Sequence, residues 1–120
     1  MGFYREPRAD FGRLAWELLR AARLVVDTGL HHKRWTREQA IAYLDANVPQ
    51  THGANRKAID RYIVWPGQAT AYTTGMQKIL KLRARARQAL GSRFDVREFH
   101  HTVLSNGAVL LDVLESVVEA

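Results

Sequence analysis

Hydrophobic residues recur with the period of an α-helix from residue 11 to residue 26, where two apolar stripes run side by side. The first stripe consists of Phe11, Leu14, Ala15, Leu18, Ala22 and Val25, and the second adds Trp16, Leu19 and Val26. Because a surface helix needs only one apolar stripe, we expect this helix to be covered on more than one side. Asp10 is the expected N-cap of a helix starting at Phe11, and Gly29 is the expected left-handed residue at its end.

Further helices are predicted along the rest of the chain. Thr36 and Gln39 form a capping box before a helix that ends near Asn47. A third helix is expected over about residues 54–64, and a fourth from about Pro66 to Leu90. A second capping box at residues 95–98 precedes a fifth helix, and a last helix follows the Asn106-Gly107 turn. The inward residues expected on the second, third, fifth and last helices are Ala40, Ile41, Leu44, Val48, Ile59, Tyr62, Ile63, Phe99, Val103, Leu104, Leu110, Val113, Leu114, Val117 and Val118. On the fourth helix, one face is expected to carry Tyr72, Met76, Ile79, Arg83, Ala86 and Leu90, flanked by Gly75 and Leu82.

No segment shows the alternation typical of a strand, so the predicted fold is all-α. We expect a helical bundle of five to six helices with short connections, forming a single helical domain over residues 1–120. The length of 120 residues is close to the commonest size of one domain.

The stretch from Arg61 to Gly75 is the least regular and the most promising for function. Trp65 is steered away from the helical region by the proline after it, while Pro66 suits the first position of a new helix. Gly75 lies inside the predicted fourth helix, where glycine costs about 1 kcal/mol relative to alanine. A glycine at such a position usually lets another backbone approach closely, and we expect this at Gly75.

Composition narrows the functional classes. The chain contains no cysteine, which excludes disulfides and thiolate chemistry. No apolar run reaches the ~20 residues that span a bilayer, and residues 1–7 lack the apolar core of a signal peptide. We therefore expect the chain as it stands to be cytoplasmic, while the compartment of any longer parent and the status of Met1 as a natural start stay open.

Positive charge is concentrated in the second half of the chain. The net charge is +6, and residues 61–94 contain seven Lys or Arg residues and no Asp or Glu. Such a stretch can bind nucleic acid or another anionic partner, or it can be a solvated face or a face that meets an acidic domain. No helix-turn-helix or base-stacking signature is present, so nucleic acid is not the partner we expect.

Several motifs, in order along nearly the whole chain, resemble the C-terminal region of a bacterial family. They are FGRL at residues 11–14, AARLVVDTGLH at 21–31, WTREQA at 35–40, RYIVWPGQA at 61–69, Tyr72, RFDVREFH at 93–100, NGA at 106–108 and LDVLE at 111–115. The family is domain of unknown function 885, which is similar to helical zinc peptidases of the gluzincin type. The resemblance implies a longer parent protein whose zinc ligands, including an HExxH motif, lie upstream of the matched region.

The resemblance also suggests roles for particular residues. In related peptidases a tyrosine or histidine donates a hydrogen bond to the oxyanion, and Tyr62 is the first candidate for this role, with Tyr72 the second. Both rings could instead be core residues. Gln68 could meet a substrate or make a structural hydrogen bond.

Two further residues are candidates for substrate binding. Arg61 could bind a peptide carboxylate bidentately or pair with Asp60 or Asp27. His31 could face a substrate cleft or cap the carbonyls of the preceding helix.

The histidines do not predict a metal site. His31-His32 and His100-His101 are adjacent pairs, whose side chains point about 100° apart on a helix and cannot chelate from one face. No HExxH motif occurs, so we expect no cofactor in this chain and zinc only in a full-length protein.

Two functions remain after these exclusions. The first is a C-terminal helical subdomain of a zinc-metallopeptidase-like protein, inactive alone and contributing to a substrate cleft beside the metal-bearing portion. The second is a stand-alone basic helical module for an anionic partner. In either case, helices that are apolar on two sides predict a homo-oligomer formed through exposed apolar faces.

Overall fold

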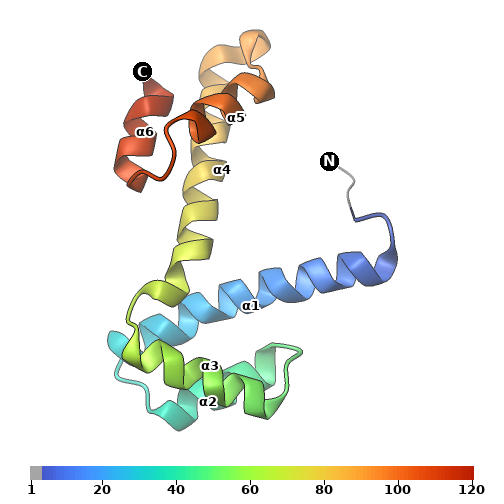
Figure 1. Cartoon of the computed structure of the whole chain (residues 1–120), viewed down its shortest axis with the longest axis vertical. Coiled ribbons are helices and arrows are strands. Elements are labelled where there is room, and N and C mark those ends of the chain that lie inside the picture. The colour runs from blue at the N-terminus through green and yellow to red at the C-terminus, as the bar shows by residue number, and fades with distance from the viewer. Residues whose placement is uncertain (1–3) are drawn as a thin grey trace. The chain divides into compact units, whose positions relative to one another are not determined.

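The structure is a computed structural model that describes residues 4–120. These residues form six α-helices and two 3₁₀ turns and include no strand, which confirms the all-α prediction (Figure 1). The elements are α1 (Pro7–His31), α2 (Arg37–Asn47), α3 (His52–Val64), η1 (Gln68–Thr70), α4 (Ala71–Leu90), η2 (Gly91–Arg93), α5 (Val96–Ser105) and α6 (Leu111–Glu119). None of these helices is long and apolar enough to cross a bilayer.

The chain divides into two compact units, Met1–Thr73 and Thr74–Ala120. The first contains α1, α2, α3 and η1, and the second contains most of α4 together with α5 and α6. A single domain spanning both units stays a prediction.

Helix α1 begins earlier than predicted. Its N-cap is Glu6, whose carboxylate accepts the Ala9 N–H at 2.8 Å, and Pro7 takes the first helical position. The prediction of Asp10 as the cap is therefore wrong: Asp10 lies inside the first turn and pairs with Arg13 at 2.7 Å. The helix continues to His31.

Gly29 does not end α1 in the left-handed conformation that we predicted. It is a buried residue inside the helix, and its φ is not positive. The Trp35 ring packs directly against it, because a β-carbon added at Gly29 would lie 2.5 Å from Cε3 of Trp35. Glycine is needed here for close approach rather than for an unusual backbone angle.

The core of the first unit takes up residues of both apolar stripes of α1, all of them in the C-terminal half of the helix. Its buried residues are Leu19, Ala22, Val26, Ala40, Ile41, Leu44, Val48, Ile59, Tyr62 and Ala69. In the N-terminal half of α1, large residues of both stripes are exposed: Phe11 is 65%, Leu14 50%, Trp16 57% and Leu18 47% accessible. The described residues of the first unit therefore do not supply the expected coverage on more than one side in this half of the helix.

The capping box of α2 is confirmed. Gln39 N donates to Thr36 Oγ1 at 3.1 Å, and Thr36 N donates to Gln39 Oε1 at 2.8 Å. Helix α3 begins at His52, two residues before the predicted start, because Thr51 caps it by accepting the Ala54 N–H.

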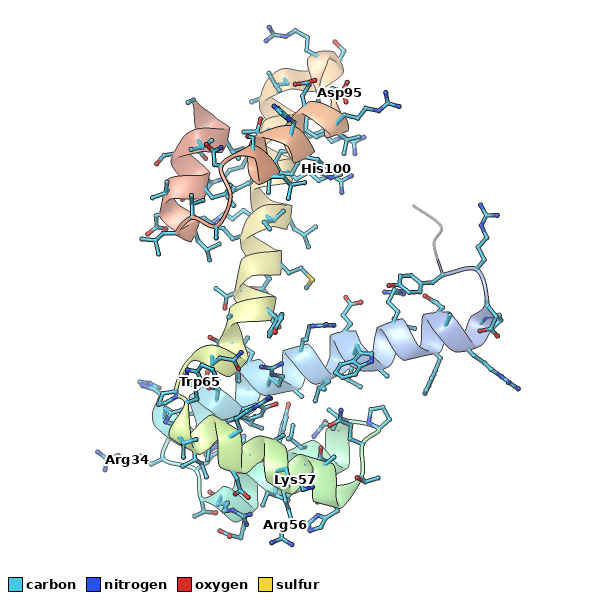
Figure 2. The ribbon with its side chains drawn as sticks, viewed as in Figure 1. Arg34, Arg56, Lys57, Trp65, Asp95 and His100 are labelled. Atoms are coloured by element: carbon cyan, nitrogen blue, oxygen red, sulfur yellow. The ribbon has the colours of Figure 1, made fainter. Side chains whose placement is uncertain are left out.

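The break between α3 and α4 falls where predicted, but α4 starts later than Pro66. Trp65 ends α3 and is 60% exposed (Figure 2). Gly67 has φ +81°, a left-handed value that no helix start can include, so the chain makes a turn before η1 and enters α4 at Ala71. Ile63, predicted to face inward, is 40% exposed.

The inward face of α4 is narrower than predicted. Leu82 is fully buried and Ile79 and Ala86 pack beside it, whereas Met76 and Leu90 are 44% and 42% exposed. No described atom would lie within 4 Å of a β-carbon added at Gly75, so the close backbone approach expected there is absent from residues 4–120.

The second unit has a small core built from one residue of each helix, Leu82, Phe99 and Leu114. Three predicted inward residues are instead exposed: Leu104 by 74%, Leu110 by 78% and Val113 by 46%. Leu110 precedes α6 as its N-cap, so its side chain lies outside the helical face that packs.

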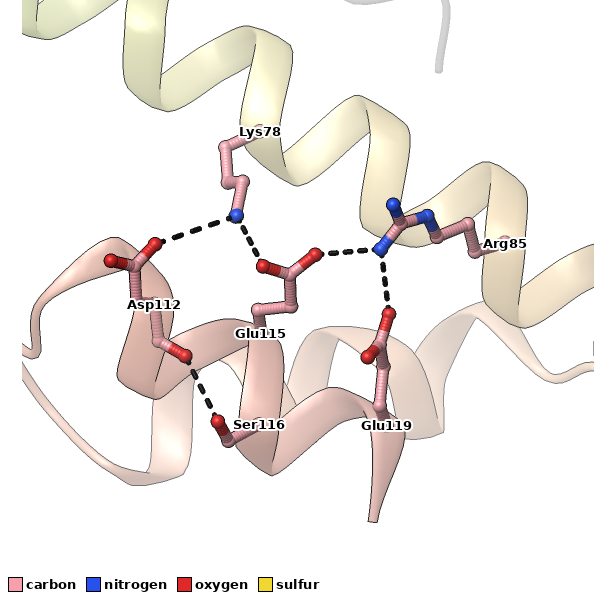
Figure 3. Close-up of polar contacts among 6 residues, drawn as sticks. All are labelled: Lys78, Arg85, Asp112, Glu115, Ser116 and Glu119. Atoms are coloured by element: carbon pink, nitrogen blue, oxygen red, sulfur yellow. Dashed lines mark hydrogen bonds and ion pairs between the residues drawn. The ribbon is translucent and has the colours of Figure 1, made fainter.

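Ion pairs hold α6 against α4 (Figure 3). Lys78 Nζ contacts Glu115 Oε2 at 2.5 Å, and Arg85 Nη1 contacts Glu115 Oε1 at 2.6 Å and Glu119 Oε1 at 2.7 Å. Two cations of the acid-free stretch are thus neutralised by acids from the end of the same chain.

Candidate functional site

Aromatic rings and guanidinium groups alternate in the first unit where α1 meets α3 and the first turn of α4. We call this set the arginine–aromatic ladder; in spatial order it consists of Trp16, Arg20, Tyr72, Arg23, Tyr62 and Arg61. At one end, the Arg20 guanidinium carbon lies 5.8 Å from the Trp16 ring centre and 5.6 Å from that of Tyr72. One cation thereby joins a ring of α1 to a ring of α4.

Arg23 is the central member of the ladder. Its guanidinium carbon lies 4.9 Å from the Tyr72 ring centre and 5.4 Å from the Tyr62 ring centre. Arg61 closes the other end, 5.2 Å from the Tyr62 ring. Each such contact contributes about 0.5–1 kcal/mol at an exposed site, so together they fix the arginines in place.

Helical spacing on α1 explains half of the ladder. Trp16, Arg20 and Arg23 follow one another by four and three residues, which places them on one side of the helix. Tyr62 and Arg61 come from the last turn of α3, and Tyr72 from the first turn of α4. The stretch from Arg61 to Gly75 therefore contributes half of a surface that α1 completes.

The Gly67 turn is anchored to α1 by Asp27. The Asp27 side chain is buried, and its two carboxylate oxygens accept the Gly67 N–H at 3.2 and 3.1 Å. A few residues later, Thr73 Oγ1 donates to the Arg20 carbonyl at 2.9 Å. These two contacts bracket η1 and determine where Tyr72 lies.

Gln68 makes the structural hydrogen bond that was one of its two expected roles. Its Oε1 accepts from Arg23 Nη2 at 3.0 Å. Arg23 Nε is buried and has no hydrogen-bond partner among residues 4–120. Within residues 4–120, therefore, only part of the hydrogen-bonding capacity of Arg23 is used.

His31 binds a different helix from the one we expected it to cap. Its Nε2 lies 2.9 Å from the Tyr62 carbonyl, at the end of α3, and donates a hydrogen bond there. The free carbonyl of α1 at Thr28 is taken by the backbone N–H groups of His32 and Lys33. His31 therefore positions the segment that carries Tyr62.

Arg61 forms neither of the predicted ion pairs. Asp60 is bound by Arg37, with N–O distances of 2.6 and 3.0 Å, and Asp27 is used by the Gly67 turn. The exposed Arg61 side chain lies instead over the Tyr62 ring.

The ladder is a cationic surface without acids. Arg20, Arg23 and Arg61 have no carboxylate within ion-pair distance among the described residues. Glu17, the acid nearest to Arg20 in sequence, is bound by Arg13 at 2.9 Å. The N–H donors of the ladder arginines are therefore available to an anion from outside these residues.

The two tyrosines differ in accessibility. Tyr62 is 2% exposed and packs in the core, whereas Tyr72 is 51% exposed. Of the two rings, only Tyr72 presents a large surface to a ligand. Trp16, Arg20 and Arg23 are candidate functional residues that sequence reasoning missed. The signal that could have found them is their helical spacing on α1, which ends at Arg23, four residues before Asp27.

No group of three or more His, Asp or Glu side chains within residues 4–120 is arranged to hold a metal ion. The donors described in this part of the chain do not fit a zinc site.

The fold and this surface define an all-α protein with an arginine–tyrosine site at the junction of three helices. The sequence matches, over residues 1–118, the family described as "Bacterial protein of unknown function (DUF885)", and the chain belongs to that family. No curated protein matches the chain.

A solved crystal structure is similar throughout the chain. It is described as "the putative lipoprotein from Colwellia psychrerythraea", is 53% identical in sequence, and superposes with a TM-score of 0.95. The match covers 98% of this chain and 20% of that one. The chain therefore spans about a fifth of the length of this relative.

Proposed function

We propose that this chain is the C-terminal helical subdomain of a longer, zinc-peptidase-like protein, inactive alone and forming part of a substrate cleft wall. The observation that carries the proposal is the arginine–aromatic ladder. The ladder contains Arg61, Tyr62 and Tyr72, which are candidates from the sequence. Gln68, another candidate, is hydrogen-bonded to Arg23, the central arginine of the ladder.

Two features support a missing larger portion. The relative with the same fold is about five times longer, since this chain covers 20% of it. Large apolar residues in the N-terminal half of α1 are exposed, with Phe11 65% and Leu14 50% accessible, which is typical of a helix that packs in a larger body. The remaining peptidase-like portion is the partner that we propose for this chain.

The exposed Tyr72 hydroxyl is the better candidate to donate a hydrogen bond to an oxyanion, a contact that contributes about 3–4 kcal/mol in enzymes that use it. The Tyr62 ring contacts the guanidinium groups of Arg23 and Arg61, and His31 donates a hydrogen bond to the Tyr62 carbonyl. Zinc, bound by residues outside this chain, would supply the activated water.

The test is a chimera in which this chain replaces the matching fifth of the long relative. We expect zinc-dependent peptide hydrolysis by the chimera and none by the 120-residue chain alone. Tyr72→Phe should lower kcat of the chimera about 10²–10³-fold with little change in KM. Tyr43→Phe, a tyrosine that packs against Trp35 away from the ladder, is the matched control.

Two results would contradict the proposal. One is peptide cleavage by the isolated chain with zinc; the other is a chimera whose kcat responds equally to Tyr72→Phe and Tyr43→Phe.

The alternative, a basic module for an anionic partner such as nucleic acid, has less support. Lys78 and Arg85, two of the cations that suggested it, are paired with Glu115. Absence of DNA and RNA binding at low salt would remove this alternative. A cytoplasmic location also stays a prediction, because the similar solved protein is described as a lipoprotein.

A further inference from the structure

We propose that the arginine–aromatic ladder binds a carboxylate group of a peptide, with Arg23 as its central hydrogen-bond donor and Arg20 and Arg61 as the flanking cations. The inference rests on the proposed function and deepens it by naming the substrate group. Its test measures binding alone, so the two proposals can fail separately.

The first argument is uncompensated charge. Three guanidinium groups lie along one surface, and Arg20 and Arg61 donate no hydrogen bond to any residue in the described range 4–120. Contact with a ring offsets part of the charge without supplying a hydrogen-bond acceptor. Oxygen acceptors from a ligand would complete these groups.

The second argument is the buried Arg23 Nε, which has no acceptor among residues 4–120. A buried donor without a partner destabilises the fold, and such groups are rare unless a further partner binds. Arg20 shares the Tyr72 ring with Arg23, and Arg61 shares the Tyr62 ring with it, so the positive charges of both neighbours also attract an anion bound at Arg23.

The third argument is preorganisation. Rings on both sides hold Arg20 and Arg23 in position, so less side-chain entropy is lost when an anion binds. The guanidinium fork matches the two oxygens of a carboxylate.

Next to the ladder there is room for the rest of a peptide. Trp16 and Arg20 line a surface hollow of about 420 Å³ together with Gly12 and Arg13. Its combination of apolar ring surface and cations suits a peptide segment that ends in, or carries, a carboxylate.

The geometry favours a carboxylate over a phosphate. Phosphate sites commonly use free backbone N–H groups at a turn or helix start. The Gly67 N–H is already occupied by Asp27, whose buried negative charge would repel a dianion more strongly than a monoanion.

The experiment is an NMR titration of the 120-residue chain at 0.15 M salt, in which the Arg Nε–H and Trp16 indole N–H signals are followed. The probe is acetyl-Ala-Ala-Ala with a free C-terminal carboxylate, compared with the same peptide as its C-terminal amide and with inorganic phosphate. We expect the carboxylate peptide to shift the signals of Arg20, Arg23 and Arg61, and the amide to bind at least about tenfold more weakly.

Variants separate recognition from general attraction. Arg20→Gln and Arg61→Gln change exposed side chains, keep the fold, and should each weaken binding about tenfold. Arg83→Gln removes the same charge from the exposed side of α4 and should leave binding unchanged.

Three outcomes would overturn the inference: equal binding of carboxylate and amide peptides, tighter binding of phosphate than of the carboxylate peptide, or equal losses in Arg83→Gln and Arg61→Gln. If carboxylate binding fails while the chimera keeps its Tyr72 effect, only this inference falls. If binding holds and the chimera is inactive, only the proposed function falls.

Discussion

Asp27 accepts the backbone N–H of Gly67 through both oxygens of its carboxylate, at 3.2 and 3.1 Å. The two residues are separated by 40 positions in the sequence, and the contact fixes the Trp65–Gly67 turn against α1. Tyr72 follows directly after this turn and η1, so the same contact determines where Tyr72 meets Arg20 and Arg23.

The first prediction concerns this anchor. Asp27→Ala should lower the free energy of unfolding by about 1.5–3 kcal/mol, because it removes a buried hydrogen bond to a charged acceptor and leaves the Gly67 N–H without it. Chemical denaturation of the purified chain measures the change. Glu38→Ala, at an acid whose side chain is 77% exposed, is the control and should change stability by less than about 0.5 kcal/mol. Equal losses in the two variants would show that Asp27 does not anchor the turn.

The second prediction compares one substitution at two positions of α1. Gly29→Ala should destabilise the chain by about 1–3 kcal/mol, because its β-carbon would lie 2.5 Å from a Trp35 ring atom. Gly12→Ala meets no described atom within 4 Å and should stabilise the helix by up to about 1 kcal/mol. Thermal or denaturant unfolding gives both values, and effects of the same sign would contradict the close approach of Trp35.

The third prediction concerns pH and the second unit. The hydrogen bond from the Lys78 ammonium, opposed by burial and supported by the Arg85 guanidinium, holds the pKa of Glu115 below its ordinary value of 4.5. A lowered folded pKa means that this carboxylate stabilises the fold above pH 4.5 and that the contribution is lost as pH falls through the lower folded value. The protection of the α6 amides against hydrogen exchange, measured relative to the intrinsic exchange rate at the same pH, should therefore fall on acidification below pH 4.5.

Glu115→Gln provides the check on that prediction. It should already show fast α6 exchange at neutral pH and a weaker acid dependence. Glu98→Gln changes an exposed glutamate of α5 and should keep the acid dependence of the unchanged chain. An acid dependence that survives in Glu115→Gln would assign it to another group.

The fourth prediction is self-association of the isolated chain through the exposed apolar residues in the N-terminal half of α1. Leu14 and Leu18 are 50% and 47% exposed, and burying them against a second copy removes apolar surface from water. Leu14→Gln combined with Leu18→Gln should weaken the dimer more than tenfold in sedimentation experiments. Leu104→Gln, at a residue 74% exposed on α5, is the control. A monodisperse monomer at high concentration would contradict the prediction.

Much of the local structure follows from the sequence because its causes are local. The α2 capping box, the break at Trp65-Pro66 and the helical class of every segment depend on residues a few positions apart. Errors arose where two local signals compete. Asp10 is a good cap, but Glu6 followed by Pro7 starts the helix one turn earlier.

The candidate site was only half predictable. Tyr62, Tyr72, Arg61 and Gln68 stand out in the sequence as a cluster around a break, but nothing local says which helix they meet. Arg23 lies 39 residues before Tyr62, and only the packing of α3 beside α1 brings the two together.

The sequence alone determined that this chain is helical, where its main turn lies and which family it resembles, since periodicity, capping and motif order are properties of neighbouring residues. The tertiary structure decided which residues of the two α1 stripes are buried, which partner each of Asp27, His31 and Arg61 takes, and that guanidinium groups and rings alternate where α1 meets α3 and the start of α4. Those choices depend on contacts between distant segments. An apolar stripe or an arginine in the sequence indicates only that the side chain needs a partner. The packing of the helices determines which residue that partner is.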